Sequence, residues 1–338
     1  MALIDRLTAI GDAIREKNGT TEPIPLVDMP QAILDIVSGG NETETFNIST
    51  LETTLPTNLH ACATARVNDK IYLFGGYNSS NGSRTNTILI YDITNNTLSN
   101  STQTLGESIN DFPAVAIGTD IYTFGGNKGS GDAINKVYKY DTLTHTLEHY
   151  DSLPITVCSC TICYYDGYIY IFGGQKSNTI LNSIYRYDVA NKTSELLNIT
   201  LPQKTMSISS SGVLVGNVFY VFGGTNSSTN TNGYNTIYAI DLLNQTVDTL
   251  DIVLPYGARD FSAIYFNNAV YLFGGKSNSL KKDAFVFKPD SRGITYFSNI
   301  LPTATCNINI AEYNNQIYLV GGEGLKTINV FSIENQNS

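Results

Sequence analysis

A six-residue phrase, an aromatic-aliphatic run closed by Gly-Gly, occurs six times in this chain of 338 residues. Its first four residues have high β-propensity and predict a strand buried on both faces, while the two glycines let the backbone turn where a side chain would clash. Self-similarity at a fixed period indicates a repeat architecture built from one small unit. The copies read IYLFGG, IYTFGG, IYIFGG, FYVFGG, VYLFGG and IYLVGG, and they end at Gly76, Gly126, Gly174, Gly224, Gly275 and Gly322, 47 to 51 residues apart.

The same neighbours follow most copies of the phrase. An aromatic or Ile residue precedes Asp at Tyr91-Asp92, Tyr140-Asp141, Tyr187-Asp188 and Ile240-Asp241, and an apolar residue stands seven places after the first member at Leu98, Leu147, Val247 and, after Phe287, at Ile294. A Leu-Pro pair closes the unit before the next strand begins. Each unit is therefore predicted to be four short strands joined by turns. Because the aspartates recur at equivalent positions, we expect them to cap turns rather than form a site.

These residues resemble the kelch family, whose repeats carry the double glycine, the downstream Tyr and an apolar anchor at fixed spacing. The resemblance covers residues 43–334 and implies a β-propeller with one blade per repeat. The family usually has Trp at the anchor, whereas this chain contains no Trp. Leu or Val can fill the same space between two blades, so the fold is still expected.

The two ends of the repeat region predict how the ring closes. The last unit stops after TINVFSI, residues 327–333, and lacks a fourth strand. The segment TFNISTLETTLP, residues 45–56, ends in Leu-Pro as the other outer strands do. Pairing it with the last unit would remove an open sheet edge. The fold class predicted is all-β: a six-bladed propeller over residues 41–338, closed by an N-terminal strand and preceded by a small helical segment.

Residues 1–40 lie outside the repeats. Leu3, Leu7, Ile10 and Ile14 form one apolar stripe of a predicted helix, and Asp28 is suited to cap a second one. Two short helices cannot bury this stripe, which therefore needs the propeller, a sister copy or another protein as partner. A homo-oligomer through a short coiled coil is one of these options.

The phrase LTAIGDAIREKNGTTEPIPLVDMPQAILDI, residues 7–36, resembles an N-terminal module of tail and baseplate-associated proteins in phages and prophages of Gram-positive bacteria. In that family the module precedes varied C-terminal domains. The resemblance implies that residues 1–40 are an attachment module and linker that dock on other tail or baseplate proteins through Leu3, Leu7, Ile10 and Ile14. It also implies a location in a virion or tail-like particle that is assembled in the bacterial cytoplasm. The alternative is a helical hairpin packed on the propeller.

Composition excludes several classes of partner. The net charge of −10 and pI of about 4.7, with few scattered Lys and Arg, argue against nucleic acid. No apolar run approaches the length of a membrane span, and the N-terminus lacks a signal-peptide pattern, so neither membrane insertion nor secretion is expected.

Five cysteines fall in or just before inner strands and are expected to be small buried residues. Strand alternation separates Cys163 from Cys158 and Cys160, so no metal and no cofactor is expected.

No catalytic motif stands out in the sequence. A nucleophile elbow, a phosphate-binding loop and a zinc-protease motif are all missing. The kelch resemblance admits copper oxidases and sugar epimerases. His60, His145 and His149 are too few and poorly placed for a copper site, and the inner strands contain almost no carboxylate except Glu312. The protein is therefore expected not to be an enzyme, with a sugar isomerase or lyase as the remaining alternative.

A ligand-binding face follows from propeller topology. Loops that lead from an outer strand into the next inner strand emerge on the same face as the loops after Gly-Gly. They place His60, Asp111, Lys276 and Glu323, among others, on this face. Tyrosine with amides and charged groups suits carbohydrate, because a ring packs on the sugar while polar groups bond its hydroxyls. The candidate ligand-binding residues are Tyr256, Arg259 and Asp260 as the best cluster, with Tyr77, Asn78, Arg84, Lys128 and Tyr234.

The resemblance of residues 7–36, taken with the expected binding face, implies a tail component whose N-terminal segment docks on the particle and whose propeller binds a host-surface molecule, a glycan or a protein. Repeated copies on a symmetric particle would convert weak binding into avidity. A structural decoration protein without a receptor is the alternative. The two differ in where the propeller sits on the particle.

Overall fold

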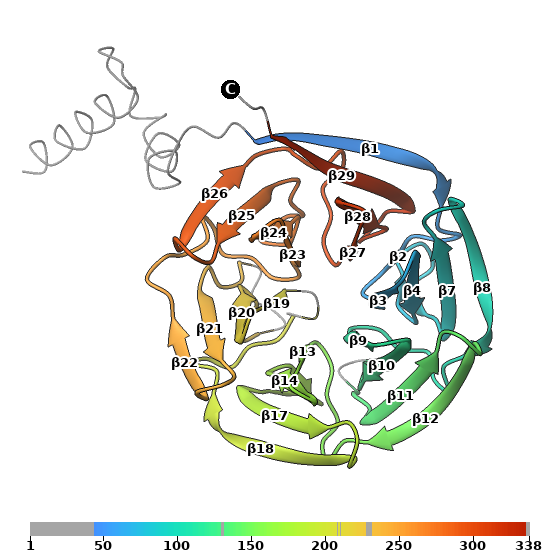
Figure 1. Cartoon of the computed structure of the whole chain (residues 1–338), viewed down its shortest axis with the longest axis vertical. Helices are drawn as coiled ribbons and strands as arrows, with labels where there is room; N and C mark the ends of the chain where they lie inside the picture. The colour runs from blue at the N-terminus through green and yellow to red at the C-terminus, as the bar shows by residue number, and fades with distance from the viewer. Residues whose placement is uncertain (1–43, 130–131, 208, 210, 228–231, 336–338) are drawn as a thin grey trace, which may run out of the picture.

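The computed structural model describes residues 44–335, except residues 130–131, 208, 210 and 228–231. Six four-stranded sheets stand around a common axis as the blades of a propeller (Figure 1). This part of the chain contains no helix, and so none that could cross a membrane. The predicted six-bladed all-β propeller is confirmed. The helices predicted within residues 1–40, with the docking residues Leu3, Leu7, Ile10 and Ile14, lie outside the described residues.

Each blade is an antiparallel sheet whose first strand lies nearest the axis and whose last strand lies at the rim (Figure 1). Blade 1 is β3 (Ala63–Val67), β4 (Lys70–Phe74), β7 (Thr87–Asp92) and β8 (Thr97–Thr104); blade 2 is β9 (Ala114–Ile117), β10 (Asp120–Phe124), β11 (Lys136–Asp141) and β12 (Thr146–Ser152); blade 3 is β13 (Thr161–Tyr165), β14 (Tyr168–Phe172), β17 (Ser183–Asp188) and β18 (Thr193–Thr200). Blade 4 is β19 (Gly212–Val215), β20 (Val218–Phe222), β21 (Ile237–Asp241) and β22 (Thr246–Thr249); blade 5 is β23 (Ser262–Phe266), β24 (Ala269–Phe273), β25 (Ala284–Lys288) and β26 (Gly293–Phe297); blade 6 is β27 (Asn309–Tyr313), β28 (Gln316–Val320), β29 (Thr327–Asn335) and β1 (Glu44–Thr54). Loops on one face add the small strands β2 (Leu59–His60), β5 (Tyr77–Asn78), β6 (Ser83–Arg84), β15 (Gln175–Lys176) and β16 (Thr179–Ile180).

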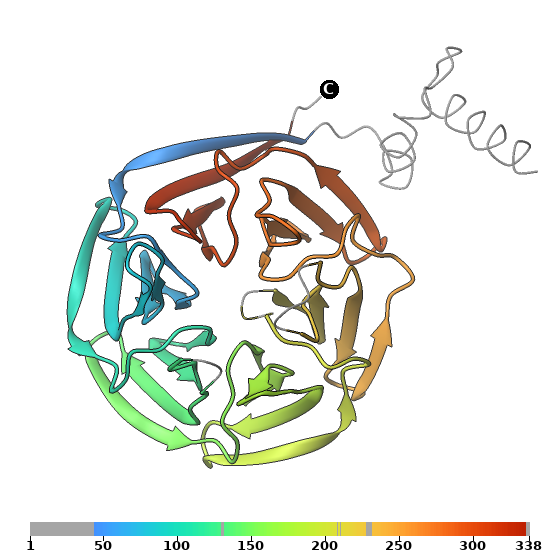
Figure 2. The same cartoon turned by 180° about the vertical axis from the view of Figure 1, so that it is seen from behind.

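The N-terminal strand closes the ring. β1 pairs antiparallel with β29, with Phe46 opposite Ile333 and Ser49 opposite Val330. Seen from behind, β1 runs along the outside of β29 and completes the sixth blade (Figure 2). The predicted strand, residues 45–56, is thus confirmed within two residues at its end. Closure leaves no blade without its outer strand, which is the physical reason for joining the two ends of the repeat region.

Hydrophobic contacts between neighbouring blades form the core. Six clusters of buried side chains occur, one at each junction between two blades. The anchors at the position where the kelch family usually has Trp take part in these clusters: Leu98, Leu147, Val247 and Ile294. Smaller aliphatic side chains therefore fill the blade junction, as predicted.

The double glycine of each repeat joins one blade to the next. The first glycine has a left-handed backbone, as at Gly125 with φ of 65°. A Cβ added there would lie 2.0 Å from the carbonyl oxygen of Val157 in the following blade. The N–H of the second glycine, Gly126, donates to that same oxygen at 2.9 Å. Glycine is required because the backbone of the next blade occupies the space of a side chain.

The recurring aspartates cap turns between the third and fourth strands. The Asp92 carboxylate accepts hydrogen bonds from the backbone and side chain of Asn95 at 2.9 and 3.0 Å, and Asp188 is bound in the same way by Asn191. Hydrogen bonds from Lys70 and Asn95 lower the pKa of Asp92 to about 2. The prediction that these aspartates are structural is confirmed.

Candidate functional site

In each blade, the loop just before the innermost strand contributes one residue to a ring around the axis. All of them have left-handed backbone, with φ between 50° and 60°. Five backbone hydrogen bonds join neighbouring members; Asp111 N–H, for example, donates to the Ala61 oxygen at 3.0 Å, and Ser159 N–H to the Asp111 oxygen at 2.7 Å. We call this set the axial ring. Its members are Ala61, Asp111, Ser159, Ser207, Asp260 and Asn307.

The axial ring brings two carboxylates together. Asp111 and Asp260 come from blades 2 and 5, three ring positions apart, and therefore lie on opposite sides of the axis. Asp260 is only 7% exposed. The two groups are close enough for the charge of Asp260 to raise the pKa of Asp111. The two acidic side chains therefore interact electrostatically across the axis.

Two arginines flank the carboxylate pair. Arg259 Nη1 donates to Asp260 Oδ2 at 2.5 Å. Arg84 is fixed by a hydrogen bond from its Nε to Asn110 Oδ1 at 2.7 Å, and the carbon at the centre of its guanidinium lies 5.6 Å from the centre of the Tyr77 ring. Asn110, which is buried, in turn donates from Nδ2 to Asp111 Oδ2 at 2.9 Å. Both guanidinium groups are therefore held in place by neighbouring side chains.

The environment shifts the titration of both carboxyl groups. Burial, followed by the charge of Asp260, raises the pKa of Asp111 to about 7, while Arg84, Asn110 and Arg259 act in the opposite direction. Burial also raises the pKa of Asp260, although the guanidinium of Arg259 opposes this shift. A carboxyl group with a pKa near 7 is half protonated at neutral pH and can either donate or accept a hydrogen bond.

A second charged group extends the site toward blades 6 and 1. Lys276 Nζ lies 2.9 and 3.0 Å from the two carboxylate oxygens of Glu323. Burial tends to raise the pKa of Glu323, but hydrogen bonds from Lys276 and from the Cys306 thiol keep it below its ordinary value. His60 is 9% exposed, its Nδ1 is buried without a hydrogen-bond partner, and burial lowers its pKa. The neutral imidazole is therefore the favoured form.

The structure confirms that the two predicted sets of loops meet on one face. His60 pairs with Tyr77 between β2 and β5, and Arg259 bridges to Lys276. We call the carboxylates Asp111 and Asp260 together with the flanking Arg84 and Arg259 the axial site. Three of the candidate ligand-binding residues, Arg84, Arg259 and Asp260, belong to it, and Tyr77 supports Arg84. Asn78 lies in β5 next to them, where its side chain accepts a hydrogen bond from the backbone of Ser80.

Three candidates have contacts of other kinds. Tyr256 is half-buried, donates its hydroxyl to Asp283 Oδ2 at 2.9 Å, and packs against the rings of Phe285 and Tyr296. These contacts are those of a structural residue, and none of them joins it to Arg259 or Asp260 as the sequence suggested. Lys128 pairs with Asp132 at 3.4 Å, and the Tyr234 hydroxyl donates to the Lys204 carbonyl at 3.3 Å.

The sequence argument against a pair of carboxylates was incomplete. It considered the inner strands, where Glu312 stands almost alone, whereas Asp111 and Asp260 come from the loops that precede those strands. The spacing between these loop residues and the Gly-Gly of their repeats did contain a signal for the pair. Five members of the axial ring stand fifteen residues before the second glycine of their repeat, so equivalent residues could have been aligned and assigned to one ring. Ser207 stands seventeen residues before Gly224 and departs from this register.

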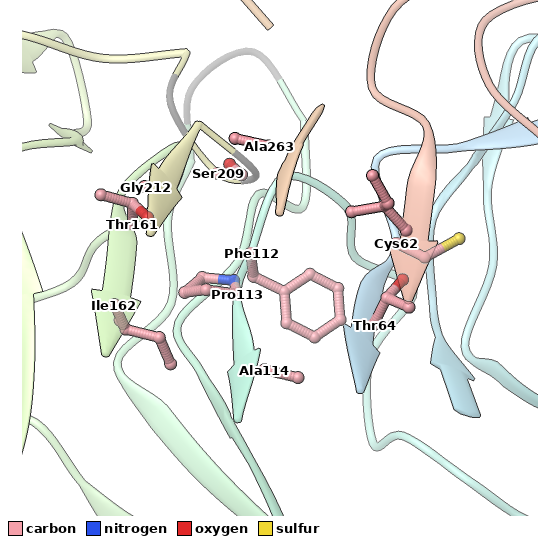
Figure 3. Close-up of a pocket in the computed structure, with 11 residues that line it drawn as sticks. Cys62, Thr64, Phe112, Pro113, Ala114, Thr161, Ile162, Ser209, Gly212 and Ala263 are labelled. Carbon is pink, nitrogen blue, oxygen red and sulfur yellow. The ribbon is translucent and has the colours of Figure 1, made fainter. Parts of the chain in front are cut away.

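Beyond the ring, the channel contains a cavity of about 160 Å³. Thr64, Ala114 and Ile162 reach it from the inner strands of three blades, and Phe112 covers part of it (Figure 3). The remaining lining residues are Cys62, Pro113, Thr161, Ser209, Gly212, Ala263 and Ile310. The surface of this cavity is mostly polar, although none of its lining residues carries a charge.

The described residues contain no group of three His, Cys, Asp or Glu side chains placed to hold a metal ion. All five cysteines are buried and free. Cys160 packs between blades 2 and 3 and Cys163 between blades 3 and 4, so these two side chains point to different blade junctions.

Comparison with known proteins gives consistent matches over the repeats. A family profile described as the KLHDC2/KLHL20/DRC7 kelch-repeats domain matches residues 111–322, and the kelch motif matches residues 59–97. Kelch domain-containing protein 3 of Rattus norvegicus is 29% identical over 195 residues, 52% of this chain and 50% of that protein. Kelch repeat and BTB domain-containing protein 2 of Ectromelia virus is 28% identical over 156 residues, 46% of this chain and 26% of that protein.

These matches span about half or less of the relatives' own length. Among solved structures, the one titled "Structure of YjhT" superposes with a TM-score of 0.69 at 15% identity, covering 84% of this chain and 99% of that one. At this identity the likeness concerns the fold alone.

Proposed function

This chain belongs to the kelch-repeat family, and from that premise we propose that it is a binding module whose axial site recognises a glycan on a host surface. The single observation that supports the proposal is the axial site itself. Polar and charged side chains from several blades converge there, and partners fix them in advance: Asn110 holds Arg84, and Asp260 holds Arg259. Preorganised polar groups lower the cost of ordering a ligand.

The balance of charge favours a glycan that carries an acidic group. Lys276 and Glu323 neutralise each other. When Asp111 is protonated, the two guanidinium groups of Arg84 and Arg259 face the single negative charge of Asp260. An anionic substituent would complete this balance and could accept paired hydrogen bonds from a guanidinium fork. Sugar hydroxyls would then bond Asp111, His60 and the neighbouring amides.

We further propose that residues 1–40 attach the propeller to a phage tail or a tail-like particle. This part of the proposal is supported by the resemblance of residues 7–36 to tail and baseplate-associated modules. Leu3, Leu7, Ile10 and Ile14 would then face another tail protein or a sister copy. A particle with several propellers would gain avidity for a repetitive surface glycan.

The test of the binding proposal is an array of acidic and neutral glycans probed with the full chain. We expect acidic glycans to bind, and the Arg84→Ala/Arg259→Ala variant to lose at least tenfold in affinity. Tyr256→Phe is the matched control, because its hydroxyl contacts Asp283 rather than the axial site, and it should bind as the wild type does. Unchanged affinity in the arginine variant would refute the axial site.

The test of the attachment proposal is immunogold imaging of particles from producing cells. Label at the tail tip or on fibres is the expected result. Label along the tail or at the neck would support the alternative, a structural decoration protein. An absence of label on particles would refute attachment while leaving the glycan test intact.

A second candidate function, a sugar isomerase or lyase, is favoured by one observation. The pKa of Asp111 lies at about 7 beside a second carboxyl group, which is the range suited to proton transfer at neutral pH. Incubating acidic sugars with the protein in D₂O and following solvent exchange at ring carbons by NMR tests it. Exchange that disappears in Asp111→Asn would establish the enzyme, and no exchange would leave binding as the function.

A further inference from the structure

The other end of the axial channel has a rim of its own. Six cavity-lining residues occupy equivalent positions on the inner strands, among them Thr64, Ile162 and Ile310. Side chains alternate along a strand, so the residues two places further on lie on the same side, farther from the axial ring. We call this set the distal rim. Its members are Arg66, Ala116, Tyr164, Leu214, Tyr265 and Glu312, one from each blade.

One half of the distal rim is charged but balanced. Arg66 Nη2 lies 3.4 Å from Glu312 Oε2, joining blades 1 and 6. Arg66 also donates from Nη1 to the Asn68 carbonyl at 2.6 Å, and the central carbon of its guanidinium lies 5.7 Å from the centre of the Tyr313 ring. Both side chains remain partly exposed, so their outer polar atoms face solvent. This half offers donors and acceptors without a net charge.

The other half is aromatic and apolar. Tyr164 and Tyr265 are 36% and 38% exposed, and Leu214 lies on the strand between them. In blade 2 the equivalent residue is Ala116, whose small side chain takes up little space on the rim. Two large aromatic side chains therefore remain accessible at a place where six strands converge.

Amide side chains extend this aromatic half. The turn after β23 contains Asn267 and Asn268, and the turn after β27 contains Asn314 and Asn315, all with left-handed backbone. Asn268 Oδ1 accepts a weak hydrogen bond from the Tyr265 hydroxyl at 3.5 Å. These amides are found in tight turns for backbone reasons. Asn268 nevertheless supplies a hydrogen-bonding group beside Tyr265, whereas Asn314 and Asn315 follow Glu312 in blade 6.

We propose that the distal rim is a second binding site, which takes a neutral sugar ring. A tyrosine face packs on the apolar face of a sugar, while amides and the Arg66–Glu312 pair bond its hydroxyls. The charges of the rim cancel, so an uncharged polar occupant is the complementary one. A wholly apolar occupant would cover Arg66 and Glu312 without replacing their water. The axial site, with its excess of guanidinium groups, would take the acidic ligand at the opposite end.

The experiment is saturation-transfer NMR on the full chain with the methyl glycosides of glucose, galactose, N-acetylglucosamine and N-acetylgalactosamine as probes. We expect at least one of them to bind and the Tyr164→Ala/Tyr265→Ala variant to bind it at least tenfold more weakly. Tyr164→Phe/Tyr265→Phe keeps the ring faces and should retain binding within threefold. Arg84→Ala/Arg259→Ala, which disrupts the axial site, should leave neutral-sugar binding unchanged.

Two results would overturn the proposal. One is the failure of all four glycosides to bind the wild-type chain. The other is binding that survives in the double alanine variant. If that variant has lost its cooperative melting transition, the single variants Tyr164→Ser and Tyr265→Ser decide in its place. Because the probes are neutral and the axial variant is included, failure here is distinguishable from failure of the acidic-glycan proposal.

Discussion

Asp111 and Asp260 face each other across the propeller axis, each in left-handed backbone and each contributed by a blade opposite the other. The pair exists because the backbone hydrogen bonds of the axial ring fix both loops in place. The consequence is chemical. Burial raises the pKa of both carboxyl groups, and that of Asp111 reaches about 7.

The first prediction concerns stability against pH. The pKa of Asp111 is about 7 in the folded state and 3.8 as its ordinary value, so the folded state retains a proton that the unfolded chain releases. Wild-type stability should therefore fall as pH rises from about 4 to 7, by up to about 4 kcal/mol at about 1.4 kcal/mol per pKa unit. Asp111→Asn should lose this component. Urea unfolding of both proteins from pH 4 to 8 measures the difference.

Comparing wild type with Asp111→Asn also separates the contribution of Asp111 to the pH dependence of stability from the contributions of other titrating groups. Asp92, whose pKa is lowered to about 2, contributes to both proteins equally. A difference in unfolding free energy that stays constant from pH 4 to 8 would contradict the prediction. In that case the carboxyl group would be ionised and solvated like any surface aspartate.

The fold was largely predictable because its determinants are local and repeated. The Gly-Gly phrase occurs in all six units and the Asp turn cap in four of them, and each predicts the local structure of its own unit. Closure by β1 was predictable as well, because one missing strand at one end matched one extra strand at the other. Periodicity converts weak local signals into a reliable statement about architecture.

The candidate site was only partly predictable. Arg84, Arg259 and Asp260 were expected on one face and lie there in the structure, but their relation to Asp111 depends on which ring positions lie opposite each other. Tyr256 was grouped with Arg259 because the two are close in sequence, and its role in binding stays a prediction. Its hydroxyl instead bonds Asp283, which is 27 residues away. Side-chain direction in a loop is set by tertiary contacts that a single sequence does not contain.

The second prediction uses two glycines with almost the same backbone. Gly125 and Gly118 have φ of 65° and 62°, but an added Cβ meets the Val157 oxygen at the first and nothing within 4 Å at the second. Gly118→Ala should cost about 1–2 kcal/mol, the price of left-handed backbone alone. Gly125→Ala should lower the unfolding free energy by at least about 3 kcal/mol relative to wild type, because the clash with the Val157 oxygen also breaks the Gly126 hydrogen bond. Chemical unfolding of both variants tests this, and equal losses would contradict it.

The third prediction concerns the thiols. All five cysteines are buried, and burial together with the charge of Asp111 raises the pKa of Cys158 to about 12. Because the thiolate is the reactive form, native protein at pH 8 should not react with a disulfide reagent over an hour, and unfolded protein should release five equivalents. A Leu143→Cys variant is the control, since Leu143 is 71% exposed and its replacement should react at once. Rapid reaction of the native wild-type protein would contradict the buried positions.

The last prediction concerns the strand that closes the ring. Phe46 of β1 lies with its ring centre 4.4 Å from that of Phe297 and 5.0 Å from that of Phe331, so it ties the first strand to blades 5 and 6. Phe46→Ala should lower the unfolding free energy by about 2–3 kcal/mol, less than for a fully buried ring because Phe46 is only half-buried. Glu52→Ala, at an exposed position of the same strand, should change it by less than about 0.5 kcal/mol.

Deleting residues 43–52 should lower the melting temperature and broaden the transition, because blade 6 then has an open edge. An unchanged melting temperature would mean that the ring is held closed by the blade junctions without β1.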